Sequence, residues 1–537
     1  MNTMISWIPI MNKPLAIMIL LSAAVFCSTS VSAAVEPAVV DPVAVALPAP
    51  RTPVPGPAPR INGPTIFGVR PASPFLYTIP ATGERPVTFA ATGLPAGLTL
   101  DAATGRITGS LTQPGTYPVT FHAKNRVGSA QKAFRIVVGD DIALTPPMGW
   151  NSYNVWGCEV DQDKTMRSAR AMIAAGLDQH GWTYINMDDG WQGARGGPSN
   201  AMQADTKRFT DIKKMCADIH DLGLKVGIYH TPWVQSYGGK AGGTSEDPTG
   251  LYDPKVQWPG KNPPNKKQLP KAIGKYSFVA ADARQFADWG IDYLKYDWAP
   301  VEAPETKEIA DALRGSGRDI VLSLSNNHIN SLINNIQEVA PLTQAWRTTG
   351  DIKDTWKSVS GIGFNQDPWA PFARPGHWND PDMLVVGYVG WGKPRPTRLT
   401  PDEQYAHVSQ WALLSAPLLI GADMEKMDPF TLGLLTNDEV IAVNQDALGK
   451  QATRVAGGKG DLAVYAKPLE DGTWAVGLFN LGASEASVSV KWSDIGLTGP
   501  QAVRDLWRQK DLGSQAEGYA VMVLSHGAEL IRLGKPQ

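Results

Sequence analysis

The sequence has very little cysteine: Cys27, Cys158 and Cys216 are the only three among 537 residues. So few cysteines exclude a disulfide framework, and no Cys/His spacing resembles a zinc site. We therefore expect no metal and no other cofactor. Stability must come from packed cores, which the 43% of hydrophobic residues can supply.

The sequence also lacks an excess of charge of either sign. Lys and Arg number 49 and Asp and Glu 51, which gives a formal net charge of −2. This balance excludes a basic surface field of the kind that holds nucleic acid or an anionic membrane. No apolar run is long enough to span a bilayer, so we expect no membrane span. The 18 Trp residues fit either a thick core or faces on which sugar rings stack.

The N-terminal segment has the three parts of a secretory signal. Lys13 gives a positive start, residues 16–26 are apolar, and the small residues 31–33 suit cleavage after Ala33. The pattern predicts that residues 1–33 are removed and that the protein is secreted or periplasmic. Met11 would serve as a start as well as Met1, because the signal is complete from there.

Three changes of pattern divide the remaining chain. Residues 34–60 are rich in Pro, Ala and Val, which predicts an extended linker. Residues 61–140 contain short β runs between Gly/Pro turns, which predicts a small β-sandwich. The stretch 93–130 resembles the immunoglobulin-like modules of bacterial secreted enzymes. Residues 448–537 read as a terminal antiparallel β-sandwich.

Between these sandwiches, residues 144–447 alternate strand and helix patterns. Apolar residues recur at Phe209, Ile212, Cys216 and Ile219, with Gly223 as a stop, which predicts a helix. Eight strand patterns occur, and they cover residues 148–152, 184–189, 225–230, 293–298, 320–325, 345–351, 377–383 and 418–423. The fold class is α/β: we predict an eight-fold β/α (TIM) barrel, with a doubly wound open sheet as the alternative. Polar residues at nearly every strand end favour the barrel.

Those polar residues are candidates for a site, because the reacting groups of such barrels come from the carboxyl ends of several strands. Burying several carboxylates there is costly unless each meets a hydroxyl or a cation. The candidates are Tyr153, Asp188, Asp189, Tyr229, Lys295, Asp297, Ser325, Arg347, Asp351 and Asp382. Asp380 is interpreted as a capping residue and is left out of this set.

Two of these carboxyls fit the hydrolysis of a glycoside with retention, which needs a pair about 5–5.5 Å apart. The attacking carboxyl must be ionised, and Lys295, two residues before Asp297, would lower the pKa of Asp297. The other must be protonated at first, so its pKa should be raised. Asp351 fits by position, although Arg347 near it would act in the opposite direction.

Several motifs carry a family resemblance. TPPMGWNSYN (145–154), YINMDDGW (184–191), DYLKYDW (292–298), WRTTGDI (346–352) and GHWNDPDML (376–384) resemble those of glycoside hydrolase family 27, the α-galactosidases and α-N-acetylgalactosaminidases.

Carried over residue by residue, the resemblance implies that Asp297 is the nucleophile and Asp351 the acid/base. Asp188 and Asp189 would bind the galactose 4- and 6-hydroxyls. The resemblance also implies that Lys295 and Tyr229 line the pocket, that Arg347 holds the 2-hydroxyl side, and that Asp382 orients the pocket.

The sequence departs from the family at four places. Tyr153 replaces a Trp that faces the sugar, and Gly190 replaces the expected disulfide partner of Cys158. Residues 325–327, Ser-Asn-Asn, replace the Cys-Glu-Trp that helps to sort the 2-substituent. The loop 231–274 is long and carries Trp233, Tyr237, Tyr252 and Trp258, and we expect it to roof the pocket or to build subsites for an oligosaccharide.

The expected function is that of an exo-acting α-galactosidase, whose partner is a carbohydrate substrate. Three other activities of the same family stay open: α-N-acetylgalactosaminidase, β-L-arabinopyranosidase and isomalto-dextran hydrolase. A non-catalytic carbohydrate-binding protein is the alternative of another class. The oligomeric state stays open.

Overall fold

The computed structural model describes residues 47–251, 273–325, 329–457 and 460–535. The expected signal segment 1–33 lies outside the described residues. So do Asn326 and Asn327, and Tyr252 and Trp258 of the long loop.

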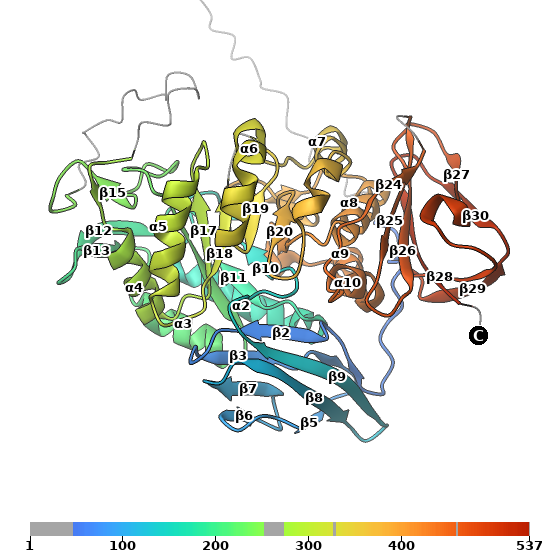
Figure 1. Cartoon of the computed structure of the whole chain (residues 1–537), viewed down its shortest axis with the longest axis horizontal. Helices are drawn as coiled ribbons and strands as arrows, with labels where there is room; N and C mark the ends of the chain where they lie inside the picture. Colours follow the sequence, from blue (N-terminus) through green and yellow to red (C-terminus); the bar gives the residue numbers. More distant parts are fainter. Residues whose placement is uncertain (1–46, 252–272, 326–328, 458–459, 536–537) are drawn as a thin grey trace, which may run out of the picture. The chain divides into compact units, whose positions relative to one another are not determined.

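The centre of the chain is a parallel β-barrel that contains all eight predicted strands (Figure 1). The strands are β10 (Met148–Asn151), β11 (Tyr184–Asn186), β14 (Lys225–His230), β17 (Tyr293–Asp297), β18 (Val321–Ser325), β19 (Ala345–Arg347), β20 (Trp378–Asp380) and β23 (Leu418–Ile420). Their order in the sheet is β20-β19-β18-β17-β14-β11-β10-β23. Leu384, just after β20, makes a parallel bridge to Ile420 of β23 and so joins the two ends of the sheet. The barrel prediction is confirmed, and the open doubly wound alternative is wrong.

Helices follow most strands and cover the outside of the barrel. They include α1 (Tyr153–Trp156), α2 (Gln162–Ala174), α3 (Ile212–Asp221), α4 (Val279–Trp289), α5 (Ala303–Arg314), α6 (Ile329–Val339), α7 (Trp356–Gly363), α8 (Pro401–Leu413), α9 (Pro429–Leu435) and α10 (Asp438–Asn444). Figure 1 shows α3, α4, α5 and α6 in succession beside the barrel strands.

Helix α3 shows why the predicted periodicity holds. The side chain of Asp211 accepts a hydrogen bond from the backbone of Lys214 and caps the first turn. Ile212, Cys216 and Ile219 are buried on one face. The chain leaves the helix next to Gly223, whose φ of 81° a residue with a side chain adopts at a cost.

Short pairs of strands and single turns of 3₁₀-helix lie in the connections. The strand pairs are β12 (Gln192–Gly196) with β13 (Ala201–Ala204), β15 (Thr244–Ser245) with β16 (Tyr276–Ser277), and β21 (Tyr388–Val389) with β22 (Arg395–Pro396). The 3₁₀-helices of the barrel are Leu177–His180, Ala340–Leu342, Asp367–Phe372 and Met424–Lys426.

The interior of the barrel is closed at one end by apolar packing. Tyr293, Val321, Met383 and Leu419 form a buried cluster with Ile142 from the segment that precedes β10. Because this cluster fills the barrel, the polar ends of the strands can be reached only from the opposite side. A substrate must therefore enter at the carboxyl ends.

The N-terminal region is a two-sheet sandwich, as predicted. One sheet has the order β2 (Ile66–Val69), β9 (Ser129–Val138), β8 (Gly115–Lys124) and β5 (Thr88–Thr92). The other has β3 (Phe75–Thr78), β7 (Arg106–Gly109) and β6 (Leu98–Leu100). The short strands β1 (Arg60–Ile61) and β4 (Ala81–Thr82) pair with each other. The alternating Val119, Phe121 and Ala123 are buried between the sheets.

Polar contacts join this sandwich to the barrel. Asp319, just before β18, accepts hydrogen bonds from the backbone of Arg70 at 2.9 Å and from the Ser73 hydroxyl at 3.1 Å. The Pro-rich segment before the sandwich also contacts the barrel. Arg51 forms an ion pair with Asp402 at 2.8 Å, and the buried Thr52 donates to the backbone of α9. Residues 51 and 52 of the expected linker are therefore packed on the barrel, while residues 53–58 are exposed.

The C-terminal region contains a six-stranded antiparallel sheet. Its order is β24 (Thr453–Ala456), β25 (Leu462–Pro468), β26 (Trp474–Asn480), β31 (Ala528–Gly534), β28 (Gln501–Asp505) and β29 (Lys510–Gln515). The pair β27 (Ala486–Lys491) and β30 (Gly518–Val523) packs against it over a shared apolar core, and a 3₁₀-helix spans Trp492–Ile495. Trp507 donates to the Ser409 hydroxyl of the buried helix α8 at 2.9 Å, which ties this sandwich to the barrel.

Candidate active site

One cavity of about 110 Å³ lies at the carboxyl ends of the barrel strands. All ten residues predicted from the sequence line it: Tyr153, Asp188, Asp189, Tyr229, Lys295, Asp297, Ser325, Arg347, Asp351 and Asp382. The strands themselves are shorter than predicted. β11 ends at Asn186 and β19 at Arg347, so Asp188, Asp189 and Asp351 lie in the loops that follow.

Sequence reasoning missed part of the lining. Asn154, Tyr237, Met383 and Trp391 complete it. Asn154 and Met383 directly follow predicted residues, and Tyr237 was expected only as part of the long loop. Trp391 lies in the connection between β21 and β22, where no periodicity or motif pointed to the cavity.

Asp188 and Lys295 form a buried ion pair on one side of the cavity. Lys295 Nζ lies 2.8 Å from Asp188 Oδ2, which also accepts a hydrogen bond from Asn151 at 2.9 Å. Asp188 is 1% exposed, so this pairing offsets a large cost of desolvation. Lys295 is thus a structural partner of Asp188 as well as a neighbour of Asp297.

Asp189 is bound by the long loop after β14. Its Oδ1 accepts from the Ser236 hydroxyl at 2.8 Å and its Oδ2 from the backbone of Gly238 at 2.6 Å. Tyr237, between these two residues, lines the cavity. The described part of the loop therefore forms one wall of the site. Burial raises the pKa of Asp189, and the hydrogen bonds from the loop act against that rise.

Asp297 is the last residue of β17, and its side chain is almost fully buried. It is 7% exposed, and its Oδ1 atom has no hydrogen-bond partner among the described residues. Burial raises the pKa of Asp297 to about 6, although the charge of Lys295 acts in the opposite direction. The expected lowering of this pKa by Lys295 is present, but the loss of water outweighs the one cation, which Asp188 also engages.

Asp351 differs from Asp297 in exposure. Its side chain is 55% exposed, and its Oδ1 lies 3.3 Å from Arg347 Nη2. Burial would raise its pKa, but the charges of Arg347 and Lys295 outweigh burial and hold the pKa below its ordinary value. The raised pKa expected of a general acid is therefore not found for Asp351.

Asp382 holds Arg347 and the loop of Asp351 together. Its Oδ2 lies 2.8 Å from Arg347 Nη2 and accepts a hydrogen bond from the backbone of Ile352 at 2.8 Å. Its own backbone is strained, with a φ of 80°, and Trp411 of α8 donates to its carbonyl at 2.6 Å. Asp382 is a positioning residue by this geometry, because it fixes the backbone next to Asp351.

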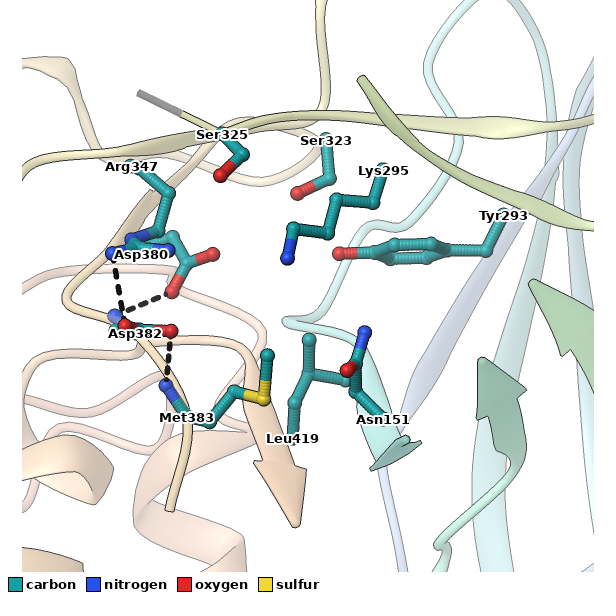
Figure 2. A pocket seen from close by; sticks show the side chains of 10 residues that line it. All are labelled: Asn151, Tyr293, Lys295, Ser323, Ser325, Arg347, Asp380, Asp382, Met383 and Leu419. Carbon is teal, nitrogen blue, oxygen red and sulfur yellow. Dashed lines mark hydrogen bonds and ion pairs between the residues drawn. The ribbon is translucent and has the colours of Figure 1, made fainter. Parts of the chain in front are cut away.

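A second, smaller chamber lies deeper in the barrel (Figure 2). It has a volume of about 10 Å³, which leaves room for one water molecule at most. Lys295, Ser325, Arg347, Asp382 and Met383 line both spaces, while Asn151, Tyr293, Ser323, Asp380 and Leu419 line the chamber alone.

Asp380, which was left out of the predicted site, belongs to this chamber. Figure 2 shows its carboxyl directed toward the backbone nitrogen of Asp382, from which it accepts a hydrogen bond at 2.8 Å. Burial raises the pKa of Asp380 to about 6, although Arg347 acts in the opposite direction. Asp380 supports Asp382 through this hydrogen bond and does not line the larger cavity.

The fold and the site together define a class of protein. The carboxyl ends of the barrel strands carry a pair of carboxyls, two cations and several buried groups that can accept hydrogen bonds from hydroxyls. These groups are typical of an enzyme that hydrolyses glycosidic bonds.

Comparison with known proteins gives the family. The family model described as Alpha galactosidase A matches residues 145–247 and 267–446, and the model of its C-terminal β-sandwich domain matches 459–533. An Ig domain model matches residues 58–139. The chain belongs to the α-galactosidase family of glycoside hydrolases.

Individual relatives agree with this membership. Alpha-galactosidase 2 of Arabidopsis thaliana is 36% identical over 412 residues, which cover 74% of this chain and 92% of that protein. The structure of α-galactosidase I from Mortierella vinacea is similar with a TM-score of 0.61 at 29% identity, over 73% of this chain and 98% of that one. A GH27 β-L-arabinopyranosidase from Geobacillus stearothermophilus has the same TM-score at 27% identity, over 73% of this chain and 97% of that one.

Proposed function

We propose that the protein is a retaining exo-α-galactosidase that acts by double displacement. Asp297 attacks the anomeric carbon of a terminal galactose while Asp351 protonates the departing glycosidic oxygen. Asp351 then removes a proton from water, which attacks the same carbon and releases Asp297. No cofactor enters this sequence of steps.

The observation that carries the proposal is the contrast between the two carboxyls that line one cavity. Asp297 is buried, and its Oδ1 atom has no partner within the described part of the chain, as suits a group that must bond to the sugar. Asp351 is exposed on the solvent side, where a leaving group departs. A sugar in the cavity displaces water from Asp351, and loss of water raises the pKa of a carboxyl toward that of a general acid.

The remaining residues of the cavity would bind the galactose. Asp188 and Asp189 keep free lone pairs for sugar hydroxyls beyond the hydrogen bonds they already accept. Arg347, whose Nε has no partner among the described residues, would hold the 2-hydroxyl side together with Ser325.

Replacement of Asp297 by Ala tests the roles. We expect release of nitrophenol from nitrophenyl α-galactoside to fall by several orders of magnitude while galactose still binds. Asp288→Ala is a matched control, because Asp288 is an exposed aspartate paired with Lys213 on the barrel surface. NMR of the first product should show the α-anomer; the β-anomer would refute double displacement. A binding protein would show affinity and no turnover.

A panel of nitrophenyl glycosides tests the choice of sugar. We expect the α-galactoside to be preferred over the α-N-acetylgalactosaminide, the β-L-arabinopyranoside and the α-glucoside. A higher kcat/KM on one of the other three would replace the α-galactosidase assignment with that activity. It would leave the chemistry at Asp297 and Asp351 in place.

We also propose export and the limits of the domains. None of the helices in the described residues has the length and apolarity to cross a membrane. The proposed parts are a cleaved signal at 1–33, a sandwich at 61–140, a barrel at 144–447 and a second sandwich at 448–537. The matched ranges 58–139, 145–247 with 267–446, and 459–533 support the three domains. N-terminal sequencing of the protein recovered outside the cytoplasm should begin at Ala34; an intact N-terminus would refute cleavage.

A further inference from the structure

Trp391 is a cavity-lining aromatic side chain that the proposed reaction does not use. It lines the same cavity as Asp297 and Asp351, and it is partly exposed. A partly exposed indole that lines a polar cavity offers a flat apolar face, and the faces of sugar rings stack on such surfaces. The position of this ring relative to the two carboxyls decides which sugar it could meet.

The leaving group must lie on the exposed side of Asp351. The floor of the cavity is closed by the buried Asp297 and by a chamber of only about 10 Å³. The terminal sugar therefore occupies the deep part of the cavity, next to Asp297. The 55% exposure of the Asp351 side chain marks the open side. An acid that protonates the departing oxygen must contact the leaving sugar on that side.

Trp391 belongs to the same side, because it is joined to the segment that carries Asp351. Lys353 Nζ lies 5.0 Å from the centroid of the Trp391 ring, within range of a cation–π contact. The fully buried carboxyl of Asp354 binds Arg395 at 2.6 Å and Arg398 at 2.8 Å, at and just beyond β22.

The backbone around Trp391 is held rigidly in place. The amides of Gly390 and Trp391 both donate to the carbonyl of Asn154, at 2.8 and 2.9 Å, and that of Gly392 donates to Val155 at 2.8 Å. Trp391 itself has a φ of 51°, a strained conformation that its surroundings must maintain. A ring fixed in this way loses little freedom on binding, which favours affinity.

We propose that Trp391, with Lys353 beside it, forms the binding subsite for the sugar that leaves. This sugar is the residue next to the terminal galactose of an oligosaccharide. The proposal rests on the proposed function, which sets the direction in which the leaving group departs. The subsite would take a neutral sugar ring, stacked on the indole and hydrogen-bonded through its hydroxyls to Lys353.

The test compares two substrates of the full-length enzyme that share galactose and differ in the leaving group. One is a disaccharide with galactose α-1,6-linked to a second hexose, and the other is α-galactosyl fluoride, which has no leaving sugar. In Trp391→Ala we expect the ratio of kcat/KM for the disaccharide to that for the fluoride to fall about tenfold, the size of one aromatic contact. Trp391→Phe should restore most of the ratio, because it keeps an aromatic face.

Other outcomes overturn the subsite or the function separately. Equal losses on both substrates would assign Trp391 a structural role only, and unchanged kcat/KM values for both substrates would place the leaving sugar elsewhere. If the wild-type enzyme releases no galactose from either substrate, the proposed function fails. The same pair of substrates, made with the sugar that the enzyme does accept, then decides the role of Trp391.

Discussion

Replacement of Asp351 by Asn isolates the ionisation of the buried Asp297. The fluoride of α-galactosyl fluoride leaves without protonation, so the first step of this variant needs only an ionised Asp297. The parameter kcat/KM reports ionisations of the free enzyme up to the first irreversible step. A plot of log kcat/KM against pH should therefore rise with unit slope and reach a plateau as Asp297 loses its proton.

The midpoint follows from the environment of Asp297. Burial raises its pKa to about 6, and the negative charge of Asp351 contributes to the rise. The variant removes that charge, so we expect a midpoint somewhat below 6 and well above the ordinary 3.8, because burial is the largest cause. Two pH units below the midpoint, kcat/KM should be about 100-fold lower than on the plateau.

A midpoint at or below 3.8 would refute this reasoning. It would mean that the charge of Lys295 outweighs the loss of water around Asp297. The wild-type enzyme on the same fluoride is the control for the protein's stability across the pH range. Adding Lys295→Met to Asp351→Asn separates the effect of the cation from that of burial, because removing the cation should raise the midpoint of the double variant.

Three further predictions concern stability and positioning. Asp297→Asn should raise the free energy of unfolding at pH 7 by up to about 3 kcal/mol in urea titrations. The reason is that a carboxyl whose pKa rises from 3.8 to about 6 on folding destabilises the folded state at high pH. The gain in stability should therefore vanish below pH 3.8. Asp382→Asn should lower kcat/KM about 100-fold and leave Arg347 only partly paired, with the circular dichroism spectrum retained as evidence of folding. Arg195→Met should cost about 3–5 kcal/mol in the same titrations, because it leaves the buried Asp282 with one ion-pair partner fewer; a loss under 1 kcal/mol would contradict this.

The fold could be predicted from the sequence because its patterns are local. Each barrel strand is a short apolar run that ends in polar residues, and helix periodicity such as that of α3 follows directly from one buried face. The ends of the strands were predicted less accurately from the sequence. The segment 345–351 reads as one run, yet only Ala345–Arg347 pairs with neighbours, because the chain must turn away to bring Asp351 over the cavity.

The candidate site likewise contains residues that could be predicted from the sequence and residues that could not. The ten predicted residues lie at or near strand ends in motifs, so the barrel topology alone brings them together. Trp391 reaches the cavity through a hairpin that is fixed by backbone hydrogen bonds to Asn154 and Val155, and no pattern in the sequence encodes those bonds. Spacing in the sequence shows Lys295, which lowers the pKa of Asp297, but not the depth of burial, which raises that pKa by more.

The exo mode of action follows from the depth at which Asp297 is buried. The cluster of Tyr293, Val321, Met383 and Leu419 closes the barrel, and the chamber above it admits no more than a water molecule. A chain of sugars therefore cannot pass through or lie across the floor, and only its end can reach Asp297. In the proposed reaction every further sugar extends past Asp351 to the open side, so Asp351, as the proposed acid, meets only the bond to the terminal unit. Length of the substrate should then affect binding at the rim near Trp391, while the chemistry at Asp297 stays that of a single galactose.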